Sequence, residues 1–173
     1  MEEWLLYCQH SSEKSYASPA FLWAVKADGS ESIQLDTKPV VGLPRWSPIE
    51  TSVVYLAQNS QQSLQLTLSL TKIEQGKATT THPLGDKELR EVSWMPDGRS
   101  LLVSTSANKD EPIRMMKVDL SGKLQDMFQI GENQKANEEM YFEQFQADGF
   151  AVSPNGRYAA FFVRPNSASI STG

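Results

Sequence analysis

The sequence predicts an all-β protein built from repeated four-stranded antiparallel units, and three observations support this prediction. A phrase of strand, proline turn and apolar strand occurs three times, with its prolines at Pro48, Pro96 and Pro154. Three glycines that follow strand-like stretches recur with a similar spacing, 47 and then 46 residues apart. No stretch of these units keeps a long helical apolar period, whereas several alternate apolar and polar residues, as strands do.

Each unit is expected to contain four strands, named a to d in chain order. Strand a ends at the proline turn, strand b is the apolar run after it, and Gly29, Gly76 and Gly122 mark the turns from c to d. The expected divisions are a first unit with strands b to d at 1–36, a second unit at 43–85, a third at 90–131, an insertion at 131–148, a fourth unit with strands a and b at 149–164, and a tail at 165–173.

The proline turns are predicted from their local chemistry. Proline sets φ for the first turn position, and Gly98 and Gly156 supply the positive φ that closes the third and fourth units' turns. The second unit has Ile49-Glu50-Thr51 at this place and no glycine, so its turn is expected to be of another kind.

Four strands per repeat and a period in the mid-forties are typical of a β-propeller blade. Such a sheet is apolar on both faces, so neighbouring sheets must cover each other. The chain is therefore expected to be a single partial propeller of about three to three and a half blades. The favoured interpretation is a segment of a longer protein. The alternative is a homo-oligomer, in which the strand at 150–152 of one copy completes the first unit of another.

Two stretches resemble the blade motif of TolB-type, or WD40-like, β-propellers, which also occurs in the propellers of prolyl oligopeptidase-like peptidases. They are Trp94–Arg99 and Val152–Arg157, and Lys26–Ser30 is similar to the hairpin after strand c in that family. The resemblance covers most of the chain and implies the fold, but this blade serves many functions. Such propellers are often extracytoplasmic, although the sequence itself assigns no compartment.

Composition and motifs argue against several classes of function. The net charge of −5, concentrated in the acidic stretch at 131–149, disfavours nucleic-acid binding. No apolar run is long enough for a membrane span. The single cysteine and the isolated His10 and His82 predict no metal site, and no cofactor motif is present. No Gly-x-Ser-x-Gly turn occurs, so this segment is expected not to be an enzyme.

Binding residues are instead expected in long loops on one face of the predicted disc, because loops on a rigid scaffold often carry function. The candidates are His10, Lys14, Tyr16, Asn108, Lys109, Met140, Tyr141 and Phe142. A short helix is expected over 134–146. The turn acids Asp28 and Asp97 are expected to be structural. Core positions are expected at Trp4, Cys8, Trp23, Trp46, Tyr55, Trp94, Phe161 and Phe162.

The function predicted from these observations is a non-enzymatic scaffold that binds a protein, a peptide or another ligand. The alternative is the propeller segment of a larger enzyme, either the gating propeller of a prolyl oligopeptidase-like peptidase or a propeller-fold lyase or glycosidase. A downstream domain with a Gly-x-Ser-x-Gly turn would favour the peptidase.

Overall fold

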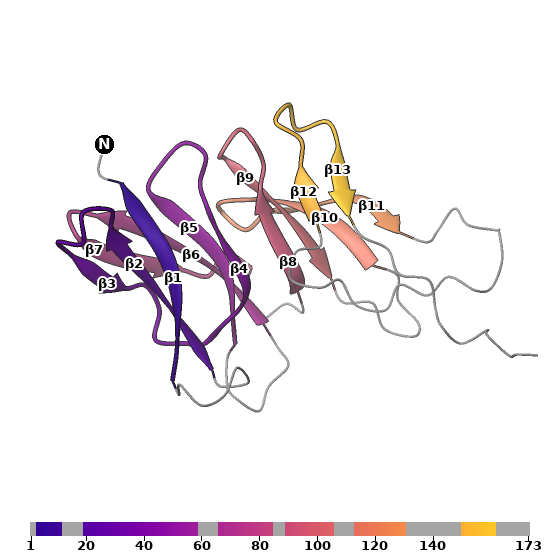
Figure 1. Cartoon of the computed structure of the whole chain (residues 1–173). Coiled ribbons are helices and arrows are strands. Elements are labelled where there is room, and N and C mark those ends of the chain that lie inside the picture. Colours follow the sequence, from indigo (N-terminus) through magenta and orange to yellow (C-terminus); the bar gives the residue numbers. More distant parts are fainter. Residues whose placement is uncertain are drawn as a thin grey trace, which may run out of the picture.

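The structure is a computed structural model that describes residues 3–11, 19–58, 66–84, 89–105, 113–130 and 150–161. The described residues form thirteen strands and no helix (Figure 1). The strands are β1 (Trp4–His10), β2 (Ala20–Lys26), β3 (Ser32–Gln34), β4 (Val40–Trp46), β5 (Ser52–Gln58), β6 (Leu66–Glu74), β7 (Lys77–Thr81), β8 (Leu89–Trp94), β9 (Ser100–Thr105), β10 (Ile113–Asp119), β11 (Leu124–Ile130), β12 (Phe150–Val152) and β13 (Ala159–Phe161). The described part of the chain contains no helix that is long and apolar enough to cross a membrane.

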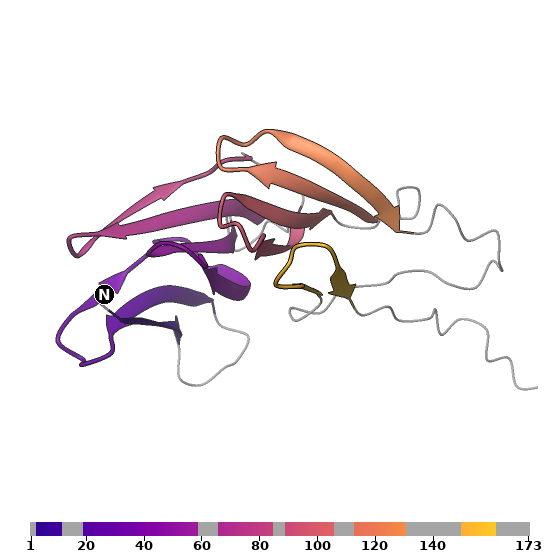
Figure 2. The same ribbon diagram turned by 90° about the horizontal axis from the view of Figure 1, so that it is seen from above.

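Four antiparallel sheets contain these strands, and within each sheet sequence neighbours pair. Their orders are β1-β2-β3, β4-β5-β6-β7, β8-β9-β10-β11 and β12-β13. The sheets follow one another in chain order as stacked layers (Figures 1 and 2). The first strands of successive sheets contact each other, β4 with β8 and β8 with β12. These strands form the inner edge of the row, and the all-β architecture of four-stranded antiparallel blades predicted from the sequence is confirmed.

Strand β5 explains why the sheets stack, because its two faces belong to two different cores. Tyr55 and its alternate neighbours pack against the first sheet, whereas Val54 and Leu56 pack against the third. The core between the first and second sheets contains Trp4, Leu22, Ala24, Leu35, Val40, Val53, Tyr55, Ala57 and Ile73. The core between the second and third sheets contains Val54, Leu56, Leu66, Leu68, Leu89, Val92, Trp94, Leu101, Val103, Met116 and Val118.

The three proline turns share one closing hydrogen bond and differ inside it. The closing backbone bonds run from Ser47 N to Ser52 O at 2.7 Å, from Met95 N to Ser100 O at 2.9 Å and from Ser153 N to Tyr158 O at 2.8 Å. Gly98 and Gly156 have φ of 62° and 68°, as expected, and each donates a further bond within its turn. The Pro48 turn has no positive φ and is held instead by Ser52 N donating to Glu50 O at 2.9 Å. The prediction of a different turn is confirmed.

The polar groups of the first core are satisfied by one another. Tyr55 Oη donates to Asp36 Oδ2 at 2.9 Å and lies 2.9 Å from Thr71 Oγ1. Thr71 Oγ1 is 2.7 Å from Thr80 Oγ1, which donates to the carbonyl of Leu35 at 3.2 Å. Burial raises the pKa of Tyr55 far above its usual value. This network, which we call the clasp, therefore links the first and second sheets through three hydroxyl groups and the Asp36 carboxylate.

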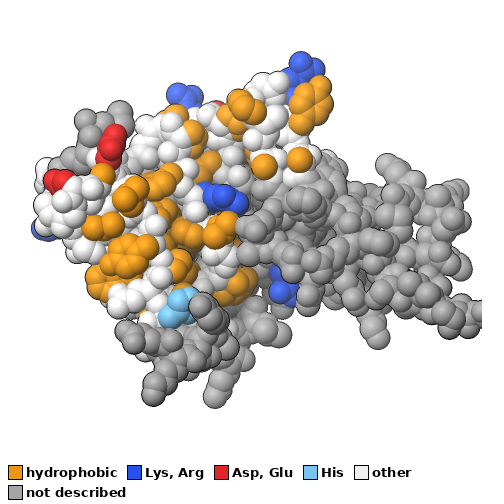
Figure 3. Space-filling view, viewed as in Figure 1, with side chains coloured by type: hydrophobic (Ala, Val, Ile, Leu, Met, Phe, Trp, Pro, Cys, Tyr) orange, Lys and Arg blue, Asp and Glu red, His pale blue; other side chains and the backbone are white. Residues whose placement is uncertain are grey.

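Among the residues that the structure describes, the first sheet is covered on one face only. Leu5 and Tyr7 point away from the second sheet and are 57% and 40% exposed. The rings of Tyr7 and Trp23 stack there with their centroids 6.3 Å apart. Apolar side chains gather over this part of the surface (Figure 3).

Two core expectations fall on this sheet and are wrong. Trp23 lies on the exposed face, and Cys8 is exposed. Trp4, Trp94 and Tyr55 are buried as expected, and Trp46 is partly buried against the first core. The pattern that placed all of these residues on strands could not distinguish a covered face from an uncovered one. The expected helix over 134–146, the side chain of Phe161 and residue Phe162 lie outside what the structure describes.

Candidate functional site

The inner strands of the two four-stranded sheets both depart from regular pairing. In β4, Val41 pairs with Leu56 and Arg45 pairs with Val54, so Gly42, Leu43 and Pro44 stand opposite a single residue of β5. Gly42 has a φ of 75°, and Pro44 has no N–H to give to the ladder. The sequence Gly-Leu-Pro thus forces this strand to bulge and turns its side chains toward the inner edge.

Strand β8 has a smaller irregularity. Leu89 pairs with Thr105 and Glu91 pairs with Ser104, so Arg90 is the extra residue. Because β4 and β8 are in contact, the two bulges face the same space. Irregularities of this kind re-aim side chains and are enriched beside functional sites, so their coincidence marks the region as a candidate site.

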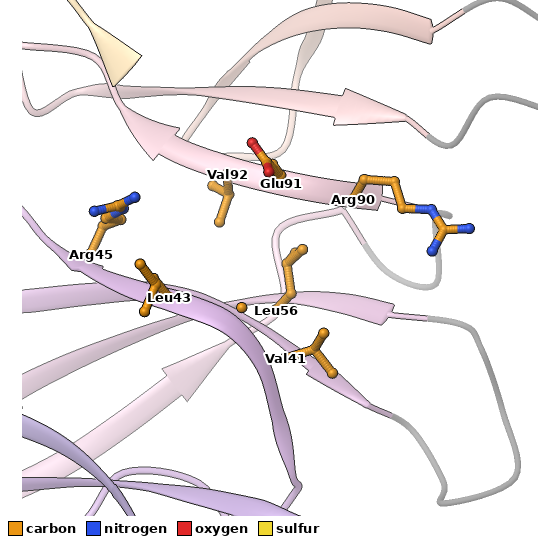
Figure 4. Close-up of a pocket in the computed structure, with 8 residues that line it drawn as sticks. Val41, Leu43, Arg45, Leu56, Arg90, Glu91 and Val92 are labelled. Carbon is orange, nitrogen blue, oxygen red and sulfur yellow. The ribbon is translucent and has the colours of Figure 1, made fainter. Parts of the chain in front are cut away.

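A small depression lies between these strands, and we call it the inner hollow (Figure 4). Its lining consists of Val41, Gly42, Leu43 and Arg45 from β4, Leu56 from β5, and Arg90, Glu91 and Val92 from β8. Leu56 and Val92 belong to the buried core and form an apolar floor. Val41 and Leu43 are 42% and 48% exposed, so they offer apolar surface that no described residue covers.

The charges of the inner hollow are two arginines and one glutamate. Arg45 is half-buried, and its guanidinium has no ion pair or hydrogen bond with any residue that the structure describes. Glu91 is buried and Arg90 is exposed, and both have interactions of their own. The inner hollow therefore has a formal positive charge, and its free donor is the Arg45 fork.

Trp94 fixes the backbone that carries this arginine. Its indole Nε1–H donates to the carbonyl oxygen of Arg45 at 3.0 Å, from the third sheet to the second. Trp94 itself is 6% exposed and packs in the second core. The backbone of Arg45 is thus held by a buried side chain of the neighbouring sheet, so the packing of both sheets sets the place from which its side chain extends.

The binding residues expected from the sequence lie almost wholly outside the described part of the chain. His10 is described and lies exposed at the end of β1, away from the inner hollow. The other candidates, Lys14, Tyr16, Asn108, Lys109, Met140, Tyr141 and Phe142, are outside the described residues. These assignments remain predictions. The inner hollow was not among the predictions from the sequence. A glycine and a proline inside a strand, as at 42–44, do indicate the bulge that helps to form it.

The turn acids and the other polar clusters offer no catalytic arrangement among the residues that the structure describes. Asp97 Oδ1 accepts the N–H of Arg99 at 2.9 Å, and Asp28 Oδ1 accepts the N–H of Ser30 at 2.9 Å. Both carboxylates close their own turns, in agreement with their expected structural role. No group of three or more His, Cys, Asp or Glu in the described ranges could hold a metal ion.

The strand order and the row of four-stranded antiparallel sheets define the fold as that of β-propeller blades. No family model matches the sequence. The peptidase YuxL of Bacillus subtilis (strain 168), which is described as uncharacterised, is 29% identical over 106 residues, or 61% of this chain and 16% of YuxL.

Two solved structures are similar to this chain, and the first of them shares its fold. A puromycin hydrolase is 22% identical with a TM-score of 0.55, over 92% of this chain and 28% of that chain. A chain assigned as TolB from Agrobacterium tumefaciens is 18% identical with a TM-score of 0.49, over 71% of this chain and 42% of that chain. This chain thus spans less than half the length of each of these three proteins.

The matches correct one expectation. The prediction that the protein is not an enzyme is wrong, because the curated relative is a peptidase and the structural relative with the higher TM-score is a hydrolase. The prediction failed because it judged an enzyme class from the motifs of one segment, whereas the matched proteins are several times longer than this chain. The matches favour the alternative of a propeller segment from a peptidase over the non-enzymatic scaffold.

Proposed function

We propose that this chain is the propeller segment of a peptidase-like hydrolase and that its inner hollow faces the peptide substrate. The observation that carries the proposal is the agreement of two independent comparisons. The sequence match is to a peptidase, and the fold match, which covers 92% of the chain, is to a hydrolase.

The geometry supports the same role. A propeller segment without its own nucleophile contributes to hydrolysis by admitting, orienting or excluding substrates. The two bulged inner strands present exposed apolar side chains and one unpaired guanidinium at the inner edge of the row. A peptide offers carbonyl oxygens, apolar side chains and a terminal carboxylate, and this surface can contact each of them.

A chimera tests the proposal. The segment of the puromycin hydrolase that matches this chain is replaced by residues 1–173, and hydrolysis of puromycin is measured beside the parent enzyme and the parent without that segment. We expect a folded chimera that retains hydrolysis, while the deletion loses it. A folded chimera without hydrolysis contradicts the proposal. A chimera that does not fold also counts against it, because these sheets then cannot replace hydrolase blades.

The sequence predicted two kinds of partner, a protein or peptide and a second copy of the chain, and the proposal treats them differently. A peptide partner becomes the substrate of the hydrolase. Self-association, in which another copy completes the propeller, stays a prediction, and the uncovered face with Leu5 and Tyr7 gives it a concrete surface. Light scattering of the purified chain tests it, since a single monomeric mass at all concentrations would exclude such an assembly.

A further inference from the structure

The inner hollow combines two features that a folded chain does not need for its own stability. An arginine side chain that is half-buried and has no partner among the described residues has lost part of its hydration without a compensating bond. Next to it, Val41 and Leu43 expose apolar surface on the same bulged strand. A ligand with an anionic group beside an apolar side chain would satisfy both features at once.

We propose, resting on the peptide-substrate function above, that the inner hollow binds the carboxylate end of a peptide whose last residue is apolar. In this arrangement the Arg45 guanidinium donates two parallel hydrogen bonds to the terminal carboxylate, the geometry for which its fork is preorganised. The apolar side chain of the last residue lies on Val41 and Leu43. The hollow thereby selects substrates by their C-terminus.

The donors of the hollow suit a carboxylate better than a phosphate group. Arg45 is the one lining cation with no partner among the described residues, so it can neutralise a single charge. The apolar floor formed by Leu56 and Val92 offers no further donor to a phosphate group.

The backbone around Arg45 suits a site that must be rigid. The carbonyl of Arg45 accepts the hydrogen bond from Trp94 Nε1 at 3.0 Å, and Arg45 pairs with Val54 in the ladder. The exposed side chains of Val41 and Leu43 stand on the bulge just before it. A donor on a fixed strand loses less conformational entropy on binding than one on a loop, which strengthens binding.

The test is an NMR titration of the isotope-labelled 173-residue chain with N-acetyl-leucine and, separately, with N-acetyl-leucine amide. The two probes have the same side chain and differ in the carboxylate. We expect the acid to shift the backbone amides of 41–45 and 90–92, and to bind about tenfold more tightly than the amide, as loss of a charge-assisted hydrogen bond implies. Equal binding of the two probes, or shifts elsewhere only, overturns the proposal.

Two variants sharpen the titration. Arg45→Met keeps the length of the side chain and removes its charge, so the preference for the acid should fall about tenfold, to near none. Arg99→Met removes an exposed arginine from a turn of the third sheet and should leave the preference unchanged. A preserved preference in Arg45→Met overturns the proposal. If Arg45→Met fails to give the dispersed spectrum of a folded chain, Arg45→Lys replaces it, and unchanged acid binding by that variant counts against the bidentate contact.

Two further titrations test the apolar contact and the carboxylate assignment, and the comparison with the chimera separates this inference from the proposed function. Leu43→Ser should weaken N-acetyl-leucine more than N-acetyl-glycine, and equal weakening contradicts the apolar contact. Inorganic phosphate should bind less tightly than N-acetyl-leucine, and tighter binding overturns the carboxylate assignment. An active hydrolase chimera together with no acid preference removes this inference alone. Acid binding by the chain together with an inactive folded chimera removes the hydrolase function and leaves the binding site.

Discussion

The second sheet, β4–β7, packs side chains on both of its faces, whereas the first sheet, β1–β3, packs them on one. In the second sheet, Tyr55 and Val54 are neighbours on one strand and lie in two different cores, each at most 1% exposed. In the first sheet, Trp4 is buried, while its neighbour Leu5 is 57% exposed. Both sheets arise from the same alternating pattern, and the difference between them is the neighbour that each face has.

The contribution of an apolar side chain to the free energy of unfolding therefore depends more on whether a neighbouring sheet covers it than on which residue it is. An apolar side chain that is buried between two sheets gains the full transfer free energy, whereas the same side chain on an uncovered face gains little. Equal substitutions in the first sheet and in a sheet that lies between two others, the second or the third, should therefore have unequal effects, and four pairs of variants test this.

The largest difference is expected for leucine. Leu68→Ala removes a fully buried side chain of the second sheet and should lower the free energy of unfolding by about 2–5 kcal/mol. Leu5→Ala removes an exposed side chain of the first sheet and should cost less than about 0.5 kcal/mol. Urea denaturation followed by circular dichroism measures both. Similar losses in the two variants would show that the Leu5 face is covered in solution.

Glycines in the turns provide the second pair. Gly122 lies in the β10–β11 turn of the third sheet with φ of 89°, and a Cβ added there would meet the carbonyl oxygen of Pro83, just after β7 of the second sheet. Gly29 lies in the β2–β3 turn of the first sheet with φ of 74°, and a Cβ added there would meet nothing. Gly29→Ala should cost about 1–2 kcal/mol for the left-handed backbone alone. Gly122→Ala should cost about 1–3 kcal/mol more, because a backbone atom must move. Thermal unfolding of both variants checks the difference, which vanishes if the third-sheet turn is free of the second sheet.

Tyrosine hydroxyls provide the third pair. Tyr55→Phe removes the hydrogen bond to Asp36 Oδ2 and the contact with Thr71 Oγ1, and it should cost about 1–3 kcal/mol. Tyr7→Phe removes only an exposed contact with Ser32 Oγ at 3.2 Å and should cost less than about 0.5 kcal/mol. The urea midpoint at neutral pH distinguishes them. A neutral Tyr55→Phe substitution would mean that the clasp between the two sheets adds no stability.

The smallest difference concerns acid. Hydrogen bonds from the Ser121 hydroxyl and from the N–H groups of Lys123 and Ser121 lower the pKa of Asp119, and the N–H and hydroxyl of Ser30 lower the pKa of Asp28. A lowered carboxyl pKa adds stability above the unfolded-state value, about 3.9, that is lost as the pH falls through the folded-state value.

Asp119→Asn should therefore reduce the loss of stability between pH 6 and pH 3 more than Asp28→Asn does, because Asp119 accepts three hydrogen bonds within its turn. The shift of the urea midpoint between these two pH values measures the loss. Variants that lose as much stability as the unmodified chain would show that neither carboxylate governs the acid response.

The turns of this fold could be predicted from the sequence because their chemistry is local. Gly98 and Gly156 take the positive φ that their turns require, and the glycine-free Pro48 turn adopts another hydrogen bond. Coverage of a face is not local, and for that reason Trp23 was placed wrongly in the core. Cys8 lies on the same face as Trp4, but it is exposed toward the far end of β1. The alternating pattern assigns a side chain to one face of a sheet, but whether that face is buried depends on the neighbouring sheet.

The candidate site could not be predicted because it depends on two bulges that meet in space. Gly42 and Pro44 indicate a broken strand, but the extra residue Arg90 in β8 leaves no comparable mark in the sequence. The contact between β4 and β8 joins residues about one full period of the repeat apart, and only the stacking of sheets brings them together. The loop residues expected to bind a partner remain predictions.

Strand β5 has a consequence for how the chain opens. Because its alternate side chains are locked into two cores, the strand cannot separate from the first sheet without also disturbing the third. Its amide hydrogens should therefore exchange with deuterium only when the second and third sheets unfold together. The amides of β1, whose outer face is uncovered, should exchange through smaller openings. Sheets that are joined by cores on both faces of one strand should unfold together in a single cooperative step. Local opening should begin at the first sheet, whose outer face is uncovered.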